Sequence, residues 1–379
     1  MRKSKQAYIC NMIAITNSRF FKGDELIANQ TVLINEGKIT GFTDGTIPDG
    51  YEVVDAEQNY LVPGFIDLQI YGSGGNLFSA YPTPETLAQM DHDLLRKGTT
   101  GFLACVATNT PEIVNQSITA AKAYRSSAKG FMGLHLEGPY LNAKRRGAHI
   151  EAYIKKAELD EVKKLVDFGD GVIKMMTIAP ELQDDQVIQY LLDQQIVLSI
   201  GHSDATFEQA TAAYQKGITT TTHLFNAMPS IHHRAPNLPT ALFNHPTAMA
   251  SIIADGNHVD FEIVKLSQKV MGDRLFLITD AVTSCHIGPY QHQLQGDKFI
   301  TPDGTLSGSN ITLAQAVQNC VNHCGVPLAT AFKMASLYPA NVLGMQSVTG
   351  KIEIGYQADL LILDGDFSPK KVFFKGEIS

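Results

Sequence analysis

The sequence lacks the features that mark membrane, secreted and nucleic-acid-binding proteins. None of its apolar runs approaches the length that a helix needs to cross a bilayer. The positive charges near the N-terminus are followed by Asn11, Asn17 and Arg19, which interrupt any signal-like apolar core. Basic residues are also in the minority, because 30 Lys and Arg face 38 Asp and Glu and leave a net charge of −8 at pH 7. This balance argues against nucleic acid or an anionic membrane as the partner.

Cysteine is scarce, and the five cysteines show no regular spacing. An odd number of scattered cysteines, at positions 10, 105, 285, 320 and 324, fits reduced thiols in a cytoplasmic protein. Cys320 and Cys324 lie four residues apart on a predicted helix, but no second pair has the spacing of zinc ligands. We therefore expect buried thiols here rather than a zinc site.

A glycine-rich G-x-G-x-x-G turn after the first buried strand is absent as well, which argues against a dinucleotide-binding fold. What the middle of the chain contains is apolar strand candidates that alternate with helical patterns such as PETLAQMDHDLLRKG and DDQVIQYLLDQQ. Eight strand–helix repeats predict a (β/α)8 TIM barrel of the α/β class rather than an open doubly wound sheet. The strand candidates are LVPGFIDLQI, TTGFLACVA, GFMGLHLEG, VIKMMTIAPE, IVLSIGHS, TTTTHLF, MASIIADG and RLFLITDA.

Both ends of the chain consist of short alternating segments separated by turn residues. YICNMIAITN, TVLINEGKITGF and YEVVDAEQNYLV predict strands near the N-terminus, and GKIEIGYQADLLILDGDF and KKVFFKGE repeat the pattern near the C-terminus. Because chain termini often lie close together, the two ends predict one small antiparallel β domain. We expect this β-sandwich to comprise residues 1–62 and 350–379, and the barrel to comprise residues 63–349.

Side chains that can bind metals or carry protons stand at the ends of the predicted barrel strands. Chemistry in such a barrel occurs at the carboxyl ends of the strands. Seven of the eight strand ends carry such residues, which is not the pattern of an apolar core. They are Asp67, Gln69 and Tyr71 on the first strand, followed by His135, Glu137, Glu181, His202, His223, Asp255, His258 and Asp280.

Glu137, His202 and His223 form the set with the clearest chemistry. A buried glutamate without a partner costs several kcal/mol, and two histidines with one glutamate match a catalytic zinc site with an open fourth position. His135 lies on the same side of its strand as Glu137 and is more simply a supporting residue. Asp280 closes an apolar strand and is a fourth metal ligand, a helix cap or, as we expect, the base that accepts a proton from water.

The motifs around these residues resemble the amidohydrolase superfamily and, within it, the N-acetylglucosamine-6-phosphate deacetylase family. The resemblance runs in order from about residue 10 to residue 375, through PGFIDLQIYG, LHLEGPYLNAKRRGAH, SIGHSDAT, TTHLFNAM, IIADGNHVD, ITDA and GKIEIGYQADLLILD. It implies a metal-dependent barrel that hydrolyses N-acetylglucosamine 6-phosphate to glucosamine 6-phosphate and acetate. In the implied mechanism, water activated by the metal attacks the amide carbonyl while Asp280 acts as general base and then as acid.

The resemblance also implies roles for individual residues. Glu137, His202 and His223 would hold the metal, and His149 would help to polarise the carbonyl of the acetamido group. The residues implied for binding of the sugar phosphate are Asn226, Ala227, Arg234 and His258. Arg234 would reach into the site of the other subunit of a homodimer, and the loop around it reads R-A-P-N where the family has R-E-P-G.

One further absence concerns the metal itself. Two-metal relatives end their first strand with D-x-H-x-H, whereas this chain has Gln69 and Tyr71 at the two histidine positions. A second ion would therefore lack two nitrogen ligands. We expect one divalent ion per subunit, Zn²⁺ in the first place, with Fe²⁺, Co²⁺ and Mn²⁺ as alternatives. Gln69 keeps a hydrogen-bonding amide, and we place it with the substrate-binding residues.

Two other functions remain open on the sequence alone. The same fold could deacetylate a different N-acetyl sugar phosphate, such as N-acetylgalactosamine 6-phosphate, or act on another amide, such as a cyclic one. A chain of this fold could also be a non-catalytic assembly protein. Such a protein would be expected to have lost Glu137, one of the two histidines or Asp280, and this chain retains them all.

Overall fold

Eight parallel strands form the largest sheet of the computed structural model, which describes residues 12–379. Residues 1–11, which include Cys10 and the start of the first predicted strand, lie outside the described residues. The eight strands pair in chain order, and each lies within one of the eight apolar segments, so the predicted barrel is confirmed. The strands are β8 (Phe65–Ile70), β11 (Thr99–Ala107), β12 (Phe131–Glu137), β13 (Ile173–Ile178), β14 (Val197–Ile200), β15 (Thr220–Thr221), β16 (Met249–Ile252) and β17 (Leu275–Leu277).

Contacts just beyond the end of β17 join the last strand of the barrel to the first. Ile70 and Ala281 form a parallel bridge, and the backbone N–H of Asp280 donates to the carbonyl oxygen of Gln69 at 2.9 Å. The hydroxyl of Thr279 donates to the carboxylate of Asp67 across the same seam. The closed barrel thus places Asp280 beside the first strand, although the two are far apart in the sequence.

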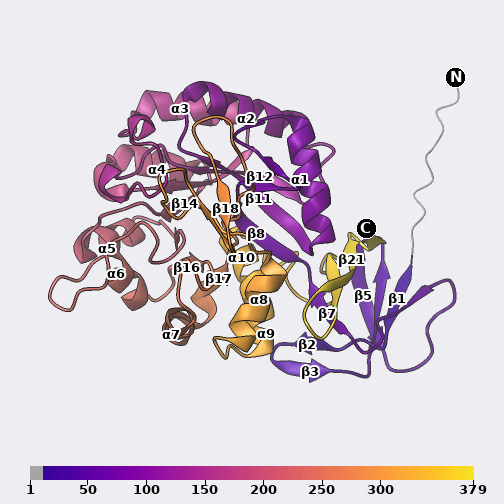
Figure 1. Cartoon of the computed structure of the whole chain (residues 1–379). Coiled ribbons are helices and arrows are strands. Elements are labelled where there is room, and N and C mark those ends of the chain that lie inside the picture. The colour runs from indigo at the N-terminus through magenta and orange to yellow at the C-terminus, as the bar shows by residue number, and fades with distance from the viewer. Residues whose placement is uncertain (1–11) are drawn as a thin grey trace, which may run out of the picture.

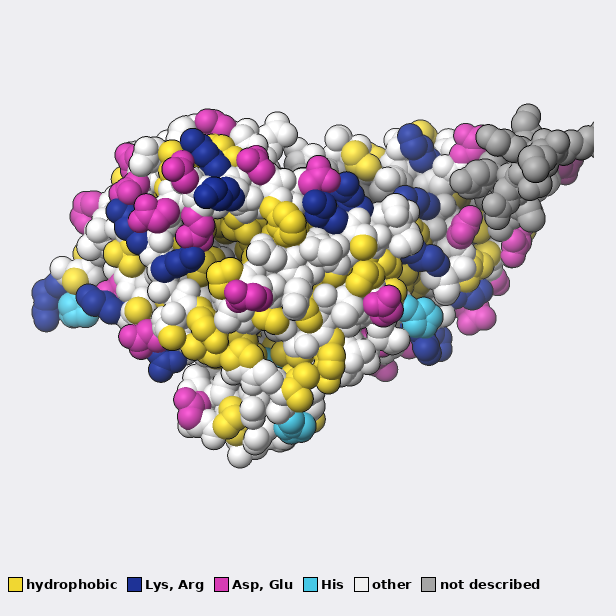
Figure 2. Space-filling view, turned by 90° about the horizontal axis from the view of Figure 1, so that it is seen from above, with side chains coloured by type: hydrophobic (Ala, Val, Ile, Leu, Met, Phe, Trp, Pro, Cys, Tyr) yellow, Lys and Arg dark blue, Asp and Glu magenta, His cyan; other side chains and the backbone are white. Residues whose placement is uncertain are grey.

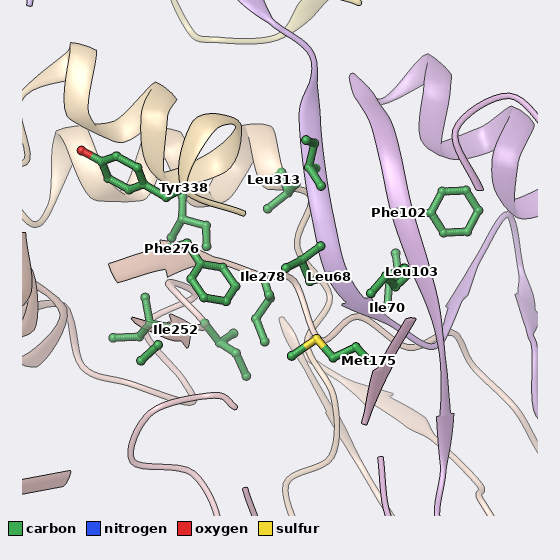
Figure 3. Close-up of a cluster of buried hydrophobic side chains, with 14 of the residues drawn as sticks. Leu68, Ile70, Phe102, Leu103, Met175, Ile252, Phe276, Ile278, Leu313 and Tyr338 are labelled. Carbon is green, nitrogen blue, oxygen red and sulfur yellow. The ribbon is translucent and has the colours of Figure 1, made fainter. Parts of the chain in front are cut away.

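Alternation along β8 explains how an almost wholly buried sheet still carries polar chemistry. All of its residues are buried, and successive side chains point to opposite sides of the sheet. Leu68 and Ile70 pack in the main hydrophobic core with side chains from other strands and from helices, as Figure 3 shows for Leu313. Asp67 and Gln69 instead find hydrogen-bond partners inside the barrel.

Helices follow the strands and surround the barrel (Figure 1). Two of them begin with a capping box, in which Thr206 or Thr312 exchanges hydrogen bonds with the glutamine three residues later. The two helical patterns read from the sequence are confirmed as the first and fourth α-helices. The helices are α1 (Pro84–Arg96), α2 (Pro111–Tyr124), α3 (Leu159–Gly169), α4 (Asp185–Asp193), α5 (Phe207–Gln215), α6 (Leu238–Asn244), α7 (Phe261–Met271), α8 (Leu313–Asn322), α9 (Leu328–Ala335) and α10 (Leu337–Val342).

Three expectations drawn from what the sequence lacks can be compared with the structure. Within residues 12–379, no helix combines the length and the apolar character needed to span a bilayer. Acidic and basic side chains are interspersed on the face shown in Figure 2, without an extended basic patch. Cys320 lies in α8 and Cys324 just beyond it, and both are free, buried thiols as predicted.

Segments from both ends of the described chain form two more sheets around a second hydrophobic core. One sheet has the order β5-β4-β1-β6 and the other β22-β21-β20-β7, so strands from the two ends lie close together (Figure 1). Their core includes Ile15, Ile34, Leu61, Ile362 and Phe373. The strands are β1 (Ile13–Thr16), β4 (Thr31–Asn35), β5 (Lys38–Thr43), β6 (Glu52–Asp55), β7 (Tyr60–Pro63), β20 (Leu360–Leu363), β21 (Pro369–Phe374) and β22 (Glu377–Ile378).

One pair in these two sheets differs from the expected antiparallel arrangement. β1 and β6 pair in parallel, because β4 and β5 form a hairpin on one edge of β1 and β6 then joins its other edge. The domain boundaries at 62/63 and 349/350 stay predictions.

A hairpin that the sequence analysis did not anticipate follows the last barrel strand. β18 (Gln293–Gln295) and β19 (Lys298–Ile300) pair antiparallel, and Figure 1 shows the hairpin in orange. Two further hairpins are formed by β2 (Phe20–Lys22) with β3 (Glu25–Ile27) and by β9 (Gly72–Ser73) with β10 (Asn76–Leu77). The segment between β17 and α8 supplies residues to the pocket described next.

Candidate active site

A pocket lies at the carboxyl ends of the barrel strands, where the sequence analysis expects the chemistry. Eight of the ten predicted site residues line it, and the exceptions are Gln69 and Arg234. Its wall combines ionisable side chains with apolar ones and with the segment after β17. The lining residues are Tyr71, Leu77, Ser79, Ala107, Glu137, Gly147, Ala148, His149, His202, His223, Asn226, Ala227, His258, Asp280, Val282, Tyr290, His292, Leu306, Ser307 and Gly308.

A carboxylate oxygen and two imidazole nitrogens converge at the base of this pocket. Oε1 of Glu137 lies 2.9 Å from Nε2 of His223 and 3.2 Å from Nε2 of His202, and the two nitrogens are 3.2 Å apart. The Nδ1–H of His202 donates to the carbonyl oxygen of Arg145 at 2.8 Å, so a neutral His202 presents an unprotonated Nε2. Nδ1 of His223 has no partner among the described residues, so nothing holds its Nε2 in the protonated form, and three unprotonated ligand atoms this close would favour a cation among them. The donor set and its backbone anchor therefore fit a divalent cation.

His149 faces the other carboxylate oxygen of Glu137 and has the opposite tautomer. Its Nδ1 accepts a hydrogen bond from the backbone N–H of Thr108 at 3.3 Å, so in the neutral ring Nε2 carries the proton. That N–H donates to Oε2 of Glu137 at 3.0 Å. Burial and the neighbouring His202 lower the pKa of His149, which favours the neutral ring. By distance alone, Glu137, His149 and His202 also form a compact group, with ligand atoms within 4.8 Å of one another.

Gln69 and Tyr71 both hydrogen-bond to Glu137. The amide nitrogen of Gln69 donates to Oε1 at 2.9 Å and lies 3.1 Å from the hydroxyl of Tyr71, which in turn donates to Oε2. Gln69 is buried behind the pocket wall, so the structure does not bring it to the position expected of a substrate-binding residue. Its amide and the Tyr71 hydroxyl orient the carboxylate instead.

Asp280 lies in the pocket wall with an unsatisfied carboxylate. Its Oδ1 is buried and has no hydrogen-bond partner among residues 12–379. Burial raises the pKa of Asp280 well above its ordinary value, and the carboxylates of Glu137, Asp67 and Asp255 raise it further. A cation beside these carboxylates would oppose that shift. Asp280 therefore has the setting of a group that exchanges a proton rather than of a structural ion pair.

Two of the predicted metal ligands and the predicted base have a strained backbone, as does the pocket residue Ala227, with a φ of 51°. His202, His223 and Asp280 have φ angles of 48°, 32° and 54°, in the left-handed region that non-glycine residues rarely adopt. Each follows the end of a short barrel strand. Strain of about 1–3 kcal/mol per residue persists only where the surrounding structure enforces it, and it is concentrated at functional sites.

A directional chain of hydrogen bonds crosses the barrel beneath the site. The Nδ1–H of His135 donates to the carbonyl oxygen of Leu68, and burial lowers the pKa of His135 to about 4, so its Nε2 is an acceptor. Thr177 therefore donates to Nε2 at 2.7 Å and accepts from Thr222 at 2.7 Å. Ser199 donates in turn to Thr222 at 2.6 Å. This chain links residues of β8, β12, β13 and β14 with Thr222, which follows β15 and directly precedes His223. Its contacts give His135 the surroundings of a supporting residue.

The residues expected to bind the sugar phosphate are placed unequally. Asn226 and Ala227 line the pocket and are half-buried. His258 lines it too, but its Nδ1 lies 2.6 Å from Oδ2 of Asp255 and its Nε2 donates to the carbonyl oxygen of Ser307 at 2.6 Å. Arg234 is exposed, outside the pocket, and its side chain has no hydrogen bond or ion pair with the described residues. Within one subunit, the structure does not bring Arg234 to the site.

The sequence analysis missed the contribution of the segment after β17. Tyr290, His292 and Ser307 line the pocket, and the ring of Tyr290 packs edge-on against His149 with centroids 6.3 Å apart. No motif distinguishes these residues. The only available signal is that the segment from Val282 to Asn310, between the last strand and the next helix, is long enough to cover the barrel mouth.

The fold is an eight-stranded barrel. Two histidines and a glutamate surround one point at its mouth, and an aspartate follows the last strand. Metal-dependent hydrolases have this arrangement. Comparison with protein families agrees, because the model of the amidohydrolase family matches residues 60–379. The chain belongs to the amidohydrolase family.

Within this family, the chain is similar to deacetylases of amino-sugar phosphates. It is 30% identical over 368 residues to the N-acetylglucosamine-6-phosphate deacetylase of Haemophilus influenzae, covering 93% of this chain and 96% of the relative. It is 29% identical over 351 residues to an N-acetylgalactosamine-6-phosphate deacetylase of Escherichia coli, covering 89% and 93%. The crystal structure of the N-acetylglucosamine-6-phosphate deacetylase of Pasteurella multocida has a TM-score of 0.92 at 32% identity and covers 97% of this chain and 99% of that one.

Proposed function

We propose that this chain is a metal-dependent N-acetylglucosamine-6-phosphate deacetylase, which releases acetate and glucosamine 6-phosphate. The observation that carries the proposal is the convergence of Glu137 Oε1, His202 Nε2 and His223 Nε2 on one point, in the same pocket as the unpartnered Oδ1 of Asp280. The named activity of relatives that match nearly the whole chain supports the choice of substrate.

One divalent ion per chain, bound by Glu137, His202 and His223, would act as a Lewis acid and make a water more acidic. Zinc suits this donor set, and iron, cobalt or manganese would fit the same ligands. His223 is preferred to His149 because the backbone N–H of Thr108 leaves His149 protonated at Nε2, where it cannot offer a lone pair. The hydrogen bonds from Gln69 and Tyr71 to Glu137 support the single-ion stoichiometry.

Asp280 and His149 carry the proton and charge steps in this proposal. The carboxylate of Asp280 accepts a proton from the attacking water and returns it to the amine nitrogen, which is otherwise a poor leaving group. The Nε2–H of His149, which donates to Oε2 of Glu137 in this structure, would donate to the carbonyl oxygen as negative charge develops there, once a metal holds that carboxylate. Binding of the distant phosphate orients the sugar for this reaction.

The phosphate end of the site is proposed to be completed in a cytoplasmic homodimer, with Arg234 supplied by the other subunit. Its exposure and lack of partners within the described chain leave the guanidinium free for this contact, and a guanidinium can bind phosphate in a bidentate manner. Mixing an Arg234→Ala protein with an Asp280→Asn protein tests the arrangement. Hybrid dimers should recover activity, because one site then has both Asp280 and a donated Arg234. No recovery in confirmed hybrids would place Arg234 in its own subunit's site or outside any site.

Metal analysis of the purified protein, together with acetate release from N-acetylglucosamine 6-phosphate, tests the main proposal. We expect about one divalent ion per chain. A chelator should abolish acetate release and added zinc should restore it. A preparation that no divalent ion can activate would overturn the proposed function. Two ions per chain would overturn only the inference, drawn from Gln69 and Tyr71, that the site holds a single ion.

A second candidate keeps the chemistry and changes the sugar to N-acetylgalactosamine 6-phosphate. The similarity to a deacetylase of that substrate, almost equal to that of the glucosamine enzymes, favours testing it. Comparing kcat/KM for the two epimers decides between them. A higher value for the galactosamine compound would make this second candidate the function.

A further inference from the structure

We propose that His292 is a further substrate-binding residue, which donates a hydrogen bond from Nε2 to a hydroxyl of the sugar ring and so contributes to the choice of sugar. The proposal rests on the proposed deacetylase function and adds a specificity-determining contact to it. His292 belongs to the segment after β17, which none of the sequence motifs covers.

His292 has a fixed backbone and a side chain that reaches the pocket. Its backbone pairs with that of Cys285 through two hydrogen bonds of 2.9 and 3.1 Å. The residue is 5% exposed, and its side chain lines the same pocket as His149 and Asp280. A side chain held in this way loses little conformational entropy when a ligand arrives.

Ser307 holds one ring nitrogen of His292 and leaves the other free. The Ser307 hydroxyl lies 3.1 Å from Nδ1 and has no other side-chain partner among residues 12–379, so we assign it as the donor. Nε2 then carries the proton of the neutral ring. Nε2 has no hydrogen-bond partner in the described chain. It is not one of the unpartnered polar atoms that are fully shielded from solvent, so it faces the cavity that the side chain lines.

The same serine ties His292 to the rest of the pocket. The carbonyl oxygen of Ser307 accepts a hydrogen bond of 2.6 Å from His258, which is paired with Asp255 beyond the end of β16. Ser307 itself is anchored by a backbone hydrogen bond to Phe299 of β19. The imidazole of His292 is therefore supported by the barrel and by the hairpin, as a recognition residue requires.

The charge state of His292 indicates which part of the substrate it meets. Burial lowers the pKa of His292 to about 4, so the ring is neutral near pH 7. A phosphate dianion would prefer a cationic donor such as a guanidinium. A neutral N–H group suits a sugar hydroxyl, which can accept the bond without charge compensation. Hydroxyl orientation is also what separates one N-acetylhexosamine from another.

Kinetics of His292→Phe test the contact, with His286→Phe as the matched control. His286 is an exposed histidine in the same segment and lines no part of the pocket. Loss of one neutral hydrogen bond should raise KM for N-acetylglucosamine 6-phosphate by about three- to tenfold and leave kcat within about twofold. His292→Gln, which keeps an N–H at a similar reach, should stay within about threefold of the parent KM.

Substrate analogues show whether the contact is with a hydroxyl. The His292→Phe penalty should vanish for whichever of the 3-deoxy and 4-deoxy analogues lacks the bonded hydroxyl, and persist for unphosphorylated N-acetylglucosamine. An unchanged KM, an equal penalty for both deoxy analogues, or a penalty that disappears without the phosphate would overturn the proposal. If the phenylalanine variant does not fold, the glutamine variant and Ser307→Ala with the same analogues give the answer. An inactive parent enzyme would instead refute the deacetylase function.

Discussion

The mouth of the barrel and the two-sheet unit built from the chain ends use the same backbone conformation for different purposes. In the two-sheet unit, left-handed non-glycine residues such as Asn17, Glu36 and Lys375 are exposed and lie in turns. In the barrel mouth, His202, His223 and Asp280 adopt it while buried. Exposed turns accommodate the conformation at little cost, whereas buried strain persists only when the surrounding fold enforces it.

The two regions also bury different kinds of atoms. The core of the two-sheet unit is a cluster of apolar side chains, with only a few buried polar residues such as Ser18 and Asp359 beside it, so its burial contributes mainly to stability. The barrel mouth buries carboxylates, imidazoles and hydroxyls, and one carboxylate oxygen of Asp280 has no partner among the described residues. We infer that the two-sheet unit mainly stabilises the chain, and that the polar groups buried in the barrel mouth lower its stability but are needed for the reaction. Substitutions in the two regions should therefore have opposite signatures.

Asp280→Asn should produce the largest effect in the barrel mouth. Without a carboxylate to accept and return a proton, turnover should fall by about 10²–10⁴-fold. Metal content should be unchanged, and the melting temperature should stay equal or rise, because an unpaired buried carboxylate has been removed. Acetate release, metal analysis and thermal melting measure the three quantities. Near-normal turnover, or a large loss of stability, would contradict the role given to this residue.

A pair of histidine variants separates the two possible ligand sets. His223→Ala should lose the metal and with it the activity, since only two protein ligands remain. His149→Ala should keep about one metal per chain and lose activity by about 10²–10³-fold, as expected for removal of one oxyanion donor. Metal analysis after extensive dialysis gives the readout. Metal loss in the His149 variant with retention in the His223 variant would reverse the assignment.

Phe373→Ala tests the two-sheet unit. Phe373 is fully buried in the core of the two-sheet unit, so its truncation should lower the free energy of unfolding by about 3–5 kcal/mol. The values of kcat and metal content, measured well below the melting temperature, should match the parent enzyme. Val53→Ala, at a site 55% exposed in the same unit, serves as the control and should stay within about 0.5 kcal/mol. A matching loss of kcat would show that the two regions are not independent.

Thr222→Val should have the smallest effect of these substitutions. It should change both stability and metal binding, and so combine the effects expected in the two regions. The substitution removes the hydroxyl that Ser199 and Thr177 share, at a cost in stability of about 1–3 kcal/mol. Because Thr222 precedes His223, we also expect metal affinity to fall by about tenfold, as for other groups that support metal ligands. Competition with a chelator measures the affinity. A change in stability alone would mean that the hydrogen-bond chain does not position the ligand.

Much of the barrel could be predicted because each strand is a short apolar run and seven of the eight carry a polar residue at the carboxyl end. The register of a parallel barrel then brings Glu137, His202, His223 and Asp280 to one pocket without further information. Gln69 shows the limit of this reasoning. Its position on the first strand is correct, but its amide hydrogen-bonds to Glu137 and Tyr71, and those contacts depend on which side chains lie opposite it.

The sequence by itself determined the fold class and the chemistry of the residues at the strand ends, since apolar periodicity and residue type are local properties. Only the tertiary structure decided the tautomers of His149 and His202, because each depends on a backbone group from elsewhere in the chain, Thr108 or Arg145. It also decided that His292 and Ser307 line the pocket, since a hairpin returning over the barrel has no local signature. Whether Nε2 of a histidine is a metal ligand, as proposed for His202, or a hydrogen-bond donor, as for His149, depends on the position of one proton, and long-range contacts set that position.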